Sequence, residues 1–225
     1  MKISVVMPCR NEEATVGTCV KKAKIAIKKI GADGEVIVVD NNSTDNSEKV
    51  ASGAGAAVVK QPIEGYGASC IAGLNAAKWD YIILADSDNT YDFLEIPEFV
   101  RALGEGNDFV IGSRFRGKME KGSMKALHKY IGNPFLNFIF NLLFSTSFTD
   151  THCGFRAFRR EALEKITHEE NGMEFALETL INAGKLNLKI KEIPVNYYRR
   201  KGISKLNSFK DGFGHLVFIT RRKLT

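Results

Sequence analysis

Residues 82–89 read Ile-Ile-Leu-Ala-Asp-Ser-Asp-Asn, an apolar run that ends at two carboxylates, Asp86 and Asp88. A short apolar run bounded by polar residues predicts a buried strand, and open α/β sheets bind ligands at the carboxyl ends of their strands. Alternate residues of an extended chain point to the same side, so this pair is suited to Mg2+ or Mn2+. A solvated turn that caps the next helix explains the same residues equally well.

This stretch lies within a regular alternation of β-branched and helical segments. We expect strands over 3–7, 35–39, 57–60, 81–85 and 109–111, and helices over 12–29, 44–54, 68–77 and 93–103. The alternation predicts an α/β fold with a mostly parallel, Rossmann-like sheet flanked by helices. The 225 residues, 44% of them apolar, are enough for a single domain with a substantial core.

The net charge of +6 points to an anionic partner. Basic residues concentrate in 114–129, 156–160 and 199–205. Charge alone does not choose between nucleic acid, a phosphorylated small molecule and a membrane surface. The four cysteines show no paired spacing for zinc or disulfides, and the N-terminus starts a strand rather than an export signal. We therefore expect reduced thiols and a cytosolic setting.

The second half of the chain carries amphipathic segments. Residues 112–122 form a glycine-rich basic loop that is too polar for a strand and that we expect to be mobile. Within the largely apolar segment 124–144, three asparagines recur every fourth residue and so share one face of a helix. This helix is either buried in the core or lies in a membrane interface. The basic, amphipathic segment 209–224 is likewise either an ordinary surface helix or a membrane-surface helix.

Polar motifs also follow the first two expected strands. Residues 8–12, Pro-Cys-Arg-Asn-Glu, open the first helix, and they lack the glycines that a dinucleotide-binding oxidoreductase places there. Asp40 ends the second strand, where it can accept hydrogen bonds from a base or a ribose. Turn and helix-cap roles explain Asn42 and Ser43 equally well. Residues 65–68, Gly-Tyr-Gly-Ala, either let backbone amides approach a ligand or form a simple turn.

Taken in order, these motifs resemble those of the family-2 glycosyltransferases, and among them the polyprenyl-phosphate hexosyltransferases typified by dolichol-phosphate mannose and glucose synthases. The matching segments are 8–12, 38–45, 65–68, 86–88, 112–115, 150–156 and 199–205. The resemblance implies a glycosyltransferase A type fold, in which 1–112 bind the nucleotide sugar and 113–225 bind the acceptor. It also implies metal-dependent, inverting transfer of a hexose to dolichyl or another polyprenyl phosphate.

The same resemblance implies the partners and the location. The donor is expected to be GDP-mannose, UDP-glucose or UDP-N-acetylglucosamine, and the enzyme is expected to work at the cytoplasmic face of a membrane. There it would be peripheral, or anchored by a tail absent from this chain. Transfer to a soluble or polysaccharide acceptor and a non-catalytic nucleotide-sugar-binding module remain the alternatives. Nucleic-acid binding is disfavoured, because no aromatic residues interleave with an exposed basic sheet.

By the matching positions, the resemblance assigns the donor site to residues that follow the expected strands. Asp86 and Asp88 are expected to bind the metal with the donor diphosphate, and Thr90 stands where some relatives have a better third ligand. Arg199 and Lys205 are expected to act with Asp88 and Arg114 as catalytic residues, because fixed positive charge stabilises a departing diphosphate. The other expected donor contacts are Pro8, Asn11, Glu12, Asp40, Asn42 and Gly67.

The acceptor site is assigned in the same way. Arg114 is expected to bind the acceptor phosphate bidentately, and Lys129 or His128 supplies a second contact. Asp150 is expected either to bind sugar hydroxyls or to hold the local turn through an ion pair with Arg156, which is assigned to the same site. Because a phosphate acceptor is already anionic near neutral pH, no strong general base is required.

Three other residues near these motifs receive supporting roles. Cys153 has no base partner suggested by the sequence, so we expect it to serve packing. Glu174 and Glu178 share one helix face, from which one of them is expected to orient a cation in the site.

Overall fold

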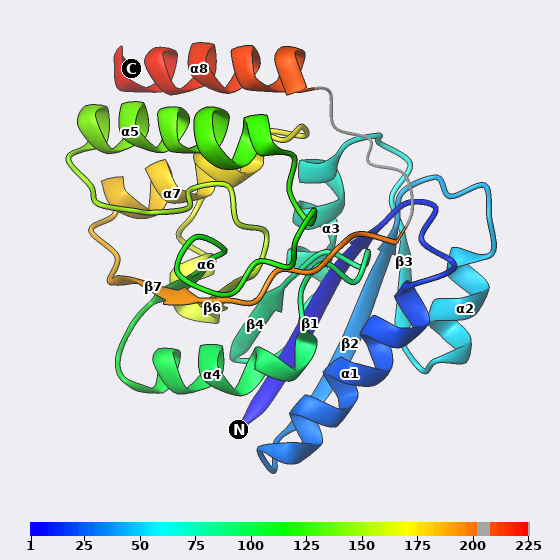
Figure 1. Ribbon diagram of the computed structural model, residues 1–225. Coiled ribbons are helices and arrows are strands. Elements are labelled where there is room, and N and C mark those ends of the chain that lie inside the picture. The colour runs from blue at the N-terminus through cyan, green and yellow to red at the C-terminus, as the bar shows by residue number, and fades with distance from the viewer. Residues whose placement is uncertain (202–207, 225) are drawn as a thin grey trace.

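The computed structural model describes residues 1–201 and 208–224, and it shows a mixed sheet with helices on both faces (Figure 1). Within these residues the sheet has seven strands in the order β3-β2-β1-β4-β6-β5-β7. The strands are Lys2–Cys9 (β1), Asp33–Asp40 (β2), Ala57–Lys60 (β3), Tyr81–Leu84 (β4), Phe109–Ser113 (β5), Arg156–Arg159 (β6) and Ile190–Pro194 (β7). The helices are Val16–Lys29 (α1), Ser47–Gly53 (α2), Tyr66–Ala76 (α3), Ile96–Gly104 (α4), Asn133–Phe144 (α5), Arg160–Leu163 (α6), Phe175–Lys185 (α7) and Ser208–Leu224 (α8), with a 3-10 turn at Phe93–Glu95 (η1) and a π-helical turn at His128–Gly132 (η2).

The chain reverses its direction of travel across the sheet at β1. β2 and β4 pair with opposite sides of β1, both in parallel, and open α/β sheets bind ligands at such a switch point. The register places Cys9 beside Asp40, and Val6 beside Leu84. β6 runs antiparallel between β4 and β5, so the segment before it, 150–155, reaches the same edge of the sheet. Distant motifs of the sequence therefore meet at this edge.

The observed elements confirm the expected α/β class. All the expected strands are present, and their ends differ from the predicted ones by at most two residues. Helix α1 begins at Val16 rather than at Glu12, because the residues between them form a turn in which Glu12 O accepts from the amides of Thr15 and Val16. β6 and β7 were not predicted. Arginines bound β6, and a lysine and a glutamate stand side by side in the middle of β7, so neither reads as an apolar run.

The loop over 112–122 differs from its prediction. Its first two residues belong to β5, and a later residue, Met119, forms a β-bridge with Tyr197. The amide of Glu120 also donates to Tyr197 O over 2.8 Å. Gly112 lies in the sheet at a position where a larger residue would clash, because a Cβ there would lie only 2.8 Å from the side chain of Val195. The expectation that this whole segment is too polar for a strand is therefore wrong for its beginning, and part of its backbone is hydrogen-bonded to the segment after β7.

Helix α5 presents its asparagines inward and much of its apolar surface outward. Asn137 is 6% exposed, whereas Phe135, Phe138 and Leu142 are 51%, 61% and 66% exposed. Leu136 and Phe140 are buried, so only part of the helix contributes to the core. We call the exposed row Leu127, Ile131, Phe135, Phe138 and Leu142 the α5 stripe. Neither alternative from the sequence is complete, since the buried face is partly polar and the side chains of the stripe remain 46% to 66% exposed.

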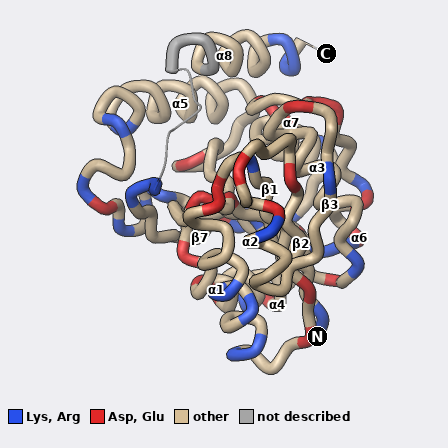
Figure 2. The backbone as a smooth tube through the Cα atoms, turned by 90° about the vertical axis from the view of Figure 1, so that its right-hand side faces the viewer, with Lys and Arg blue, Asp and Glu red and all other residues tan. Residues whose placement is uncertain are grey.

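Helix α8 lies beside α5 on the outside of the molecule (Figures 1 and 2). Figure 2 shows α5 without charged residues, while the basic residues of α8 gather at its C-terminal end. Phe213 and Val217 of α8 are 69% and 48% exposed. None of the helices in the described part of the chain is both long and apolar enough to cross a membrane.

Candidate functional site

The site is built at the carboxyl ends of β1, β2 and β4. Ser87 donates its hydroxyl to Pro8 O over 2.7 Å, which joins the loop after β4 to the end of β1. On the other side, Gly154 passes so close that a Cβ there would lie 2.8 Å from Asp86 Oδ2. Asp86 and Asp88 therefore stand between two chain segments rather than in a free surface turn. The alternative of a solvated turn is not what the structure shows.

Asp86 is a carboxylate with unused bonding capacity. Among the described residues, its Oδ1 is buried and has no hydrogen-bond partner. Burial, and next the nearby charge of Asp88, raise the pKa of Asp86 to about 7. An orphaned buried carboxylate oxygen is costly unless a proton or a cation compensates it. The geometry therefore suits a cation at Asp86.

Asp88 is held in place by its neighbours. Its Oδ1 accepts from the amide of Thr90 at 3.0 Å and from the Thr90 hydroxyl at 2.6 Å. Its Oδ2 lies 2.9 Å from Nη1 of Arg200. Thr90 thus orients Asp88, and in this arrangement its hydroxyl is not offered as a third metal ligand. Among the described residues, no group of three or more His, Cys, Asp or Glu side chains could hold a metal by itself.

Arg200 bridges the two acidic parts of the site, a role that sequence reasoning missed. Its Nη1 contacts Asp88, and its Nη2 contacts Oε1 of Glu12, an acidic residue in the loop after β1. Arg199, the expected catalytic residue, donates its backbone amide to Glu120 at 2.9 Å and lines the pocket beside the bridge, and its catalytic role stays a prediction. The sequence placed both arginines in one motif, but adjacent residues of an extended segment point to opposite sides. Lys205, the other expected cation, lies outside the described residues.

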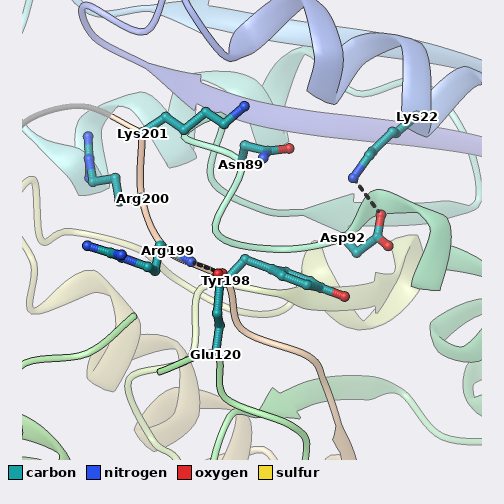
Figure 3. A pocket seen from close by; sticks show the side chains of 8 residues that line it. All are labelled: Lys22, Asn89, Asp92, Glu120, Tyr198, Arg199, Arg200 and Lys201. Carbon is teal, nitrogen blue, oxygen red and sulfur yellow. Dashed lines mark hydrogen bonds and ion pairs between the residues drawn. The ribbon is translucent and has the colours of Figure 1, made fainter. Parts of the chain in front are cut away.

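A pocket of about 460 Å³ opens beside this bridge (Figure 3). Its lining is Lys22, Asn89, Asp92, Glu120, Tyr198, Arg199, Arg200 and Lys201. Lys22 and Asp92 pair at 3.1 Å on one side of the view in Figure 3, while Arg199, Arg200 and Lys201 follow one another on the other side. Asn89 has a left-handed backbone, with φ of 62°, and its buried Oδ1 has no partner among the described residues. The pocket thus combines a hydrogen-bond acceptor that has no partner among the described residues with several basic side chains.

The residues expected to bind the nucleoside lie in linked loops. The side chain of Asn11 accepts from the amide of Thr44 at 2.7 Å, which ties the loop after β1 to the loop after β2. Asn42 donates to Pro62 O at 3.0 Å, and its left-handed φ of 58° agrees with the turn role that the sequence left open. Asp40 is 8% exposed, and among the described residues its Oδ1 has no partner. Asp40 is therefore the residue of this group with capacity left for a ligand.

Gly67 does not fit its expected role. Its amide already donates to Gly172 O at 3.1 Å, and a Cβ at this position would lie 2.1 Å from Glu170 O. The preceding Gly65 has a φ of 140°, and a Cβ there would lie 2.1 Å from Asn171 O. These glycines are required for the close approach of two backbones, and the amide of Gly67 is already used, so its contact with a donor stays a prediction without support in this arrangement.

Arg114 is paired with Asp150. The Nε and Nη2 atoms of Arg114 lie 2.7 Å and 2.8 Å from the two carboxylate oxygens, and its amide donates to Oδ2 at 3.0 Å. Its guanidinium also lies 5.2 Å from the ring centre of Tyr197. Asp150 therefore does not pair with Arg156, as one alternative had it. In this arrangement Arg114 cannot offer the same two nitrogens to a phosphate.

Arg156 is a structural residue. It is 1% exposed and donates to the carbonyl oxygens of Cys153, Ala176 and Thr151 at 2.9, 2.8 and 3.0 Å. These contacts fix the loop that carries Asp150. Because its guanidinium is both buried and occupied, the expected contact of Arg156 with an acceptor stays a prediction that this arrangement does not support.

Asn137 of helix α5 supports the same loop and was also missed as a site residue. Its Nδ2 donates to Thr149 O at 2.6 Å, while its Oδ1 accepts from the amide and the hydroxyl of Thr151 at 3.0 and 2.6 Å. Asp150 lies between these two threonines. The recurrence of asparagine every fourth residue indicates that these side chains share one face of the helix, but it does not reveal that this face is buried.

The remaining expected residues divide between support and periphery. Cys153 is fully buried, and burial raises the pKa of its thiol to about 12, which agrees with a packing role. Glu178 accepts from the amides of Glu169 and Glu170 and from Arg222 of α8, so it anchors α8 rather than orienting a cation in the site. Lys129 lies on η2, where its Nζ is 5.3 Å from the ring centre of Tyr130. Among residues 1–201 and 208–224, no contact places Lys129 in the site.

Comparison with known proteins agrees with this arrangement. The family model described as "Glycosyl transferase family 2" matches residues 4–167. The low-salt glycan biosynthesis hexosyltransferase Agl6 of Haloferax volcanii is 38% identical over 218 residues, which cover 96% of this chain and 52% of Agl6. The chain thus spans about half the length of that relative. The dolichyl-phosphate hexose transferase of the same organism is 32% identical over 212 residues, 93% of this chain and 89% of the relative.

Solved structures show the same fold. Glucosyl-3-phosphoglycerate synthase of Mycobacterium tuberculosis, in complex with Mn2+, UDP-glucose and phosphoglyceric acid, superposes with a TM-score of 0.76. It is 24% identical, and the alignment covers 99% of this chain and 79% of that one. This likeness shows the glycosyltransferase A type fold, as expected from the sequence. With the family match and the two hexosyltransferase relatives, it leads to one assignment: the chain belongs to glycosyl transferase family 2.

Proposed function

We propose that this chain transfers a hexose, with inversion, from a nucleotide-diphosphate sugar to dolichyl or another polyprenyl phosphate. The observation that carries the proposal is the carboxylate pair Asp86 and Asp88 at the end of β4, one oxygen of which is buried without a partner among the described residues. Its support from relatives is the dolichyl-phosphate hexose transferase, at 32% identity. The division of the chain into a donor half, 1–112, and an acceptor half, 113–225, stays a prediction.

Asp86 and Asp88 would hold Mg2+ or Mn2+. The relative of known structure was crystallised with Mn2+ or Mg2+ and UDP, and carboxylate oxygens are the ligands that these ions prefer. Because the described residues offer no third acidic or imidazole ligand nearby, the diphosphate and water would complete the coordination. When bound, the cation would neutralise charge on the leaving diphosphate. Arg200 pairs with Asp88, and with Arg199 it lines the adjoining pocket, from which both would add fixed positive charge.

The nucleoside would lie over the loops that follow β1 and β2. Asp40 supports this placement, since its Oδ1 is buried and has no partner among the described residues. A base or ribose donor group would satisfy that oxygen. Pro8, Asn11, Glu12 and Asn42 would shape the surrounding loops. The unsatisfied carboxylate of Asp40 favours binding of a group that donates a hydrogen bond. Guanine and uracil both carry such groups, so Asp40 does not distinguish the two bases.

The acceptor phosphate would bind on the side of Arg114 and Asp150. Arg114 would contact the phosphate through Nη1, the guanidinium nitrogen that Asp150 does not use. If Asp150 moves away, all three guanidinium nitrogens of Arg114 would become accessible to the phosphate. Lys129 would supply a further charge only if η2 approaches the site. Since the phosphate is already an anion, the chain's task is to position it and to compensate its charge, and no residue is assigned as a strong base.

The α5 stripe supports a lipid acceptor and a peripheral position at the cytoplasmic face of a membrane. A contiguous exposed apolar surface of this kind marks an interaction site, and lysines stand next to its N-terminal end. Lys121 and Lys125 are exposed there, at the level where acidic headgroups would lie. An amphipathic helix with such a border binds best to anionic bilayers.

Binding of the protein to anionic vesicles should depend on this stripe. Phe138→Glu is expected to weaken binding about ten- to a hundredfold in flotation assays, because burying one large apolar side chain contributes about 1.5–3 kcal/mol. Ile25→Glu on α1 is the matched control, since Ile25 is exposed to a similar extent, 56% against 61%. Equal weakening in both variants, or no binding of the unaltered protein, would contradict a membrane role for α5.

The acceptor is tested by incubating the protein with Mn2+, a polyprenyl phosphate and, in turn, radiolabelled GDP-mannose, UDP-glucose and UDP-N-acetylglucosamine. We expect label to enter the lipid phase with one of these donors, and chelator to prevent it. Label found only in a phosphorylated small molecule or a polysaccharide would establish the alternative acceptor class. Donor binding without transfer to any acceptor would establish a binding module. The anomeric configuration of the product, compared with the donor, tests the inversion.

A further inference from the structure

Arg200 holds together the acids on which the site depends. Its side chain is 26% exposed, while the side chains of Glu12 and Asp88 are 7% and 9% exposed. Carboxylates that are nearly buried need a nearby positive charge or a proton. In this structure the guanidinium supplies that charge to both of them at once. The ion pair therefore links the loop after β1, the loop after β4 and the segment after β7.

The Arg200 contact uses an oxygen that a metal ion also needs. Asp88 Oδ1 is occupied by the amide and hydroxyl of Thr90, and Oδ2 lies 2.9 Å from Arg200 Nη1. A divalent cation that bound Asp88 through Oδ2 would meet the guanidinium at close range. Two positive groups a few ångströms apart in a partly buried site repel each other strongly. Metal binding and the present position of Arg200 are therefore in competition.

Space and partners for a displaced Arg200 are at hand. The pocket of about 460 Å³ that Arg200 borders is also lined by Glu120, and by Asn89, whose buried Oδ1 lacks a partner among the described residues. A diphosphate bound with the metal would offer Arg200 a further anionic partner. The loss of the pair with Asp88 can thus be compensated when nucleotide and metal arrive together, but much less when the metal arrives alone.

We propose that Arg200 is the resident counter-ion of the donor-free site and that it excludes free divalent cations until a nucleotide diphosphate brings them in. The inference rests on the proposed role of Asp86 and Asp88 as metal ligands. It makes Arg200 a gate for the metal, in addition to any contact with the diphosphate. It also predicts that nucleotide and metal bind with positive cooperativity, which the exchange of partners at Asp88 provides.

The test is Mn2+ binding measured by electron paramagnetic resonance, without nucleotide and with UDP or GDP. Arg200→Gln is expected to bind Mn2+ at least tenfold more tightly than the unaltered protein when nucleotide is absent, and to show less gain on adding nucleotide. Arg200→Lys keeps the positive charge but cannot contact Glu12 and Asp88 through two separate nitrogens. Its Mn2+ affinity should lie between those of the unaltered protein and Arg200→Gln. Lys201→Gln is the matched control: it removes one charge from an exposed neighbour of the same pocket. It should change Mn2+ affinity less than threefold.

The outcomes separate this inference from the proposed function. Equal effects of Arg200→Gln and Lys201→Gln would show a general charge effect and overturn the gate. Unchanged Mn2+ affinity in all Arg200 variants would do the same. If the unaltered protein binds no Mn2+ even with nucleotide, or if Asp88→Asn binds it equally well, the metal role itself fails. Thermal melting of each variant verifies that it is folded.

Discussion

Asp88→Asn is expected to lower hexose transfer by about two to three orders of magnitude or more, since it removes charge from the centre of transition-state stabilisation. The change is nearly isosteric, and the amide oxygen can still accept from Thr90, as Asp88 Oδ1 does now at 3.0 and 2.6 Å. What is lost is the negative charge on the oxygen that faces Arg200. The rate should be measured as kcat/KM over a range of Mn2+ concentrations, so that weakened metal binding and a slower step can be separated.

Asp92→Asn is the matched control for that variant. Asp92 is also an acidic residue of the loop after β4, but it pairs with Lys22 at 3.1 Å and caps η1 through the amide of Leu94. Asparagine is an equally good cap, so folding and transfer should change little. Comparable losses in both variants would mean that transfer depends on the overall charge of the loop. Full activity of Asp88→Asn would refute the assignment of Asp88.

Asp150→Ala is expected to reduce the free energy of unfolding by about 3–5 kcal/mol, because it leaves a buried guanidinium without its partner. Arg114 and Asp150 are 10% and 0% exposed in their side chains, and three hydrogen bonds join them. Urea unfolding followed by circular dichroism measures the change directly.

Two comparisons test the cause of that destabilisation. Glu98→Ala removes a carboxylate from an exposed pair with Arg101 on α4, whose side chains are 55% and 70% exposed, and should cost no more than about 0.5 kcal/mol. The double variant Arg114→Met, Asp150→Leu removes both charges and should recover much of the lost stability. A small effect of Asp150→Ala, or a double variant as unstable as the single one, would argue that Arg114 reaches solvent or another anion.

The strands that build the site were predictable because each ends an apolar run. β1, β2 and β4 are buried on both faces, so their sequences carry continuous β-branched stretches. β6 escaped detection because Arg156 is buried in it, and a buried arginine is tolerated only through the carbonyl contacts that the fold supplies. Such contacts have no signature in a single sequence.

The identity of the site acids could be predicted for a similar reason, whereas their partners could not. Polar residues at the ends of parallel strands must meet at one edge, which made Asp40, Asp86 and Asp88 accessible to reasoning. The pairing of Asp150 with Arg114 rather than Arg156 depends on where two loops cross. The choice between Arg199 and Arg200 depends on the rotation of one extended segment. Both are tertiary facts, fixed by packing over long separations in sequence.

The behaviour of glycine illustrates the same limit. Gly67 precedes a helix in a motif that suggests an amide cradle for a ligand. The structure shows that its amide and its missing Cβ serve the backbone of residues 170–172 instead. A glycine required for close approach looks identical in sequence, whether the approaching group is a phosphate or another part of the chain.

The most direct test of the account is anomalous X-ray diffraction from crystals of the unaltered protein grown with Mn2+ and a nucleotide diphosphate. We predict one strong Mn2+ peak within bonding distance of Asp86 or Asp88, bridged to the diphosphate, and Arg200 no longer in contact with Asp88. A diphosphate bound elsewhere, with no Mn2+ peak at these carboxylates, would contradict the assignment of the end of β4 as the catalytic centre.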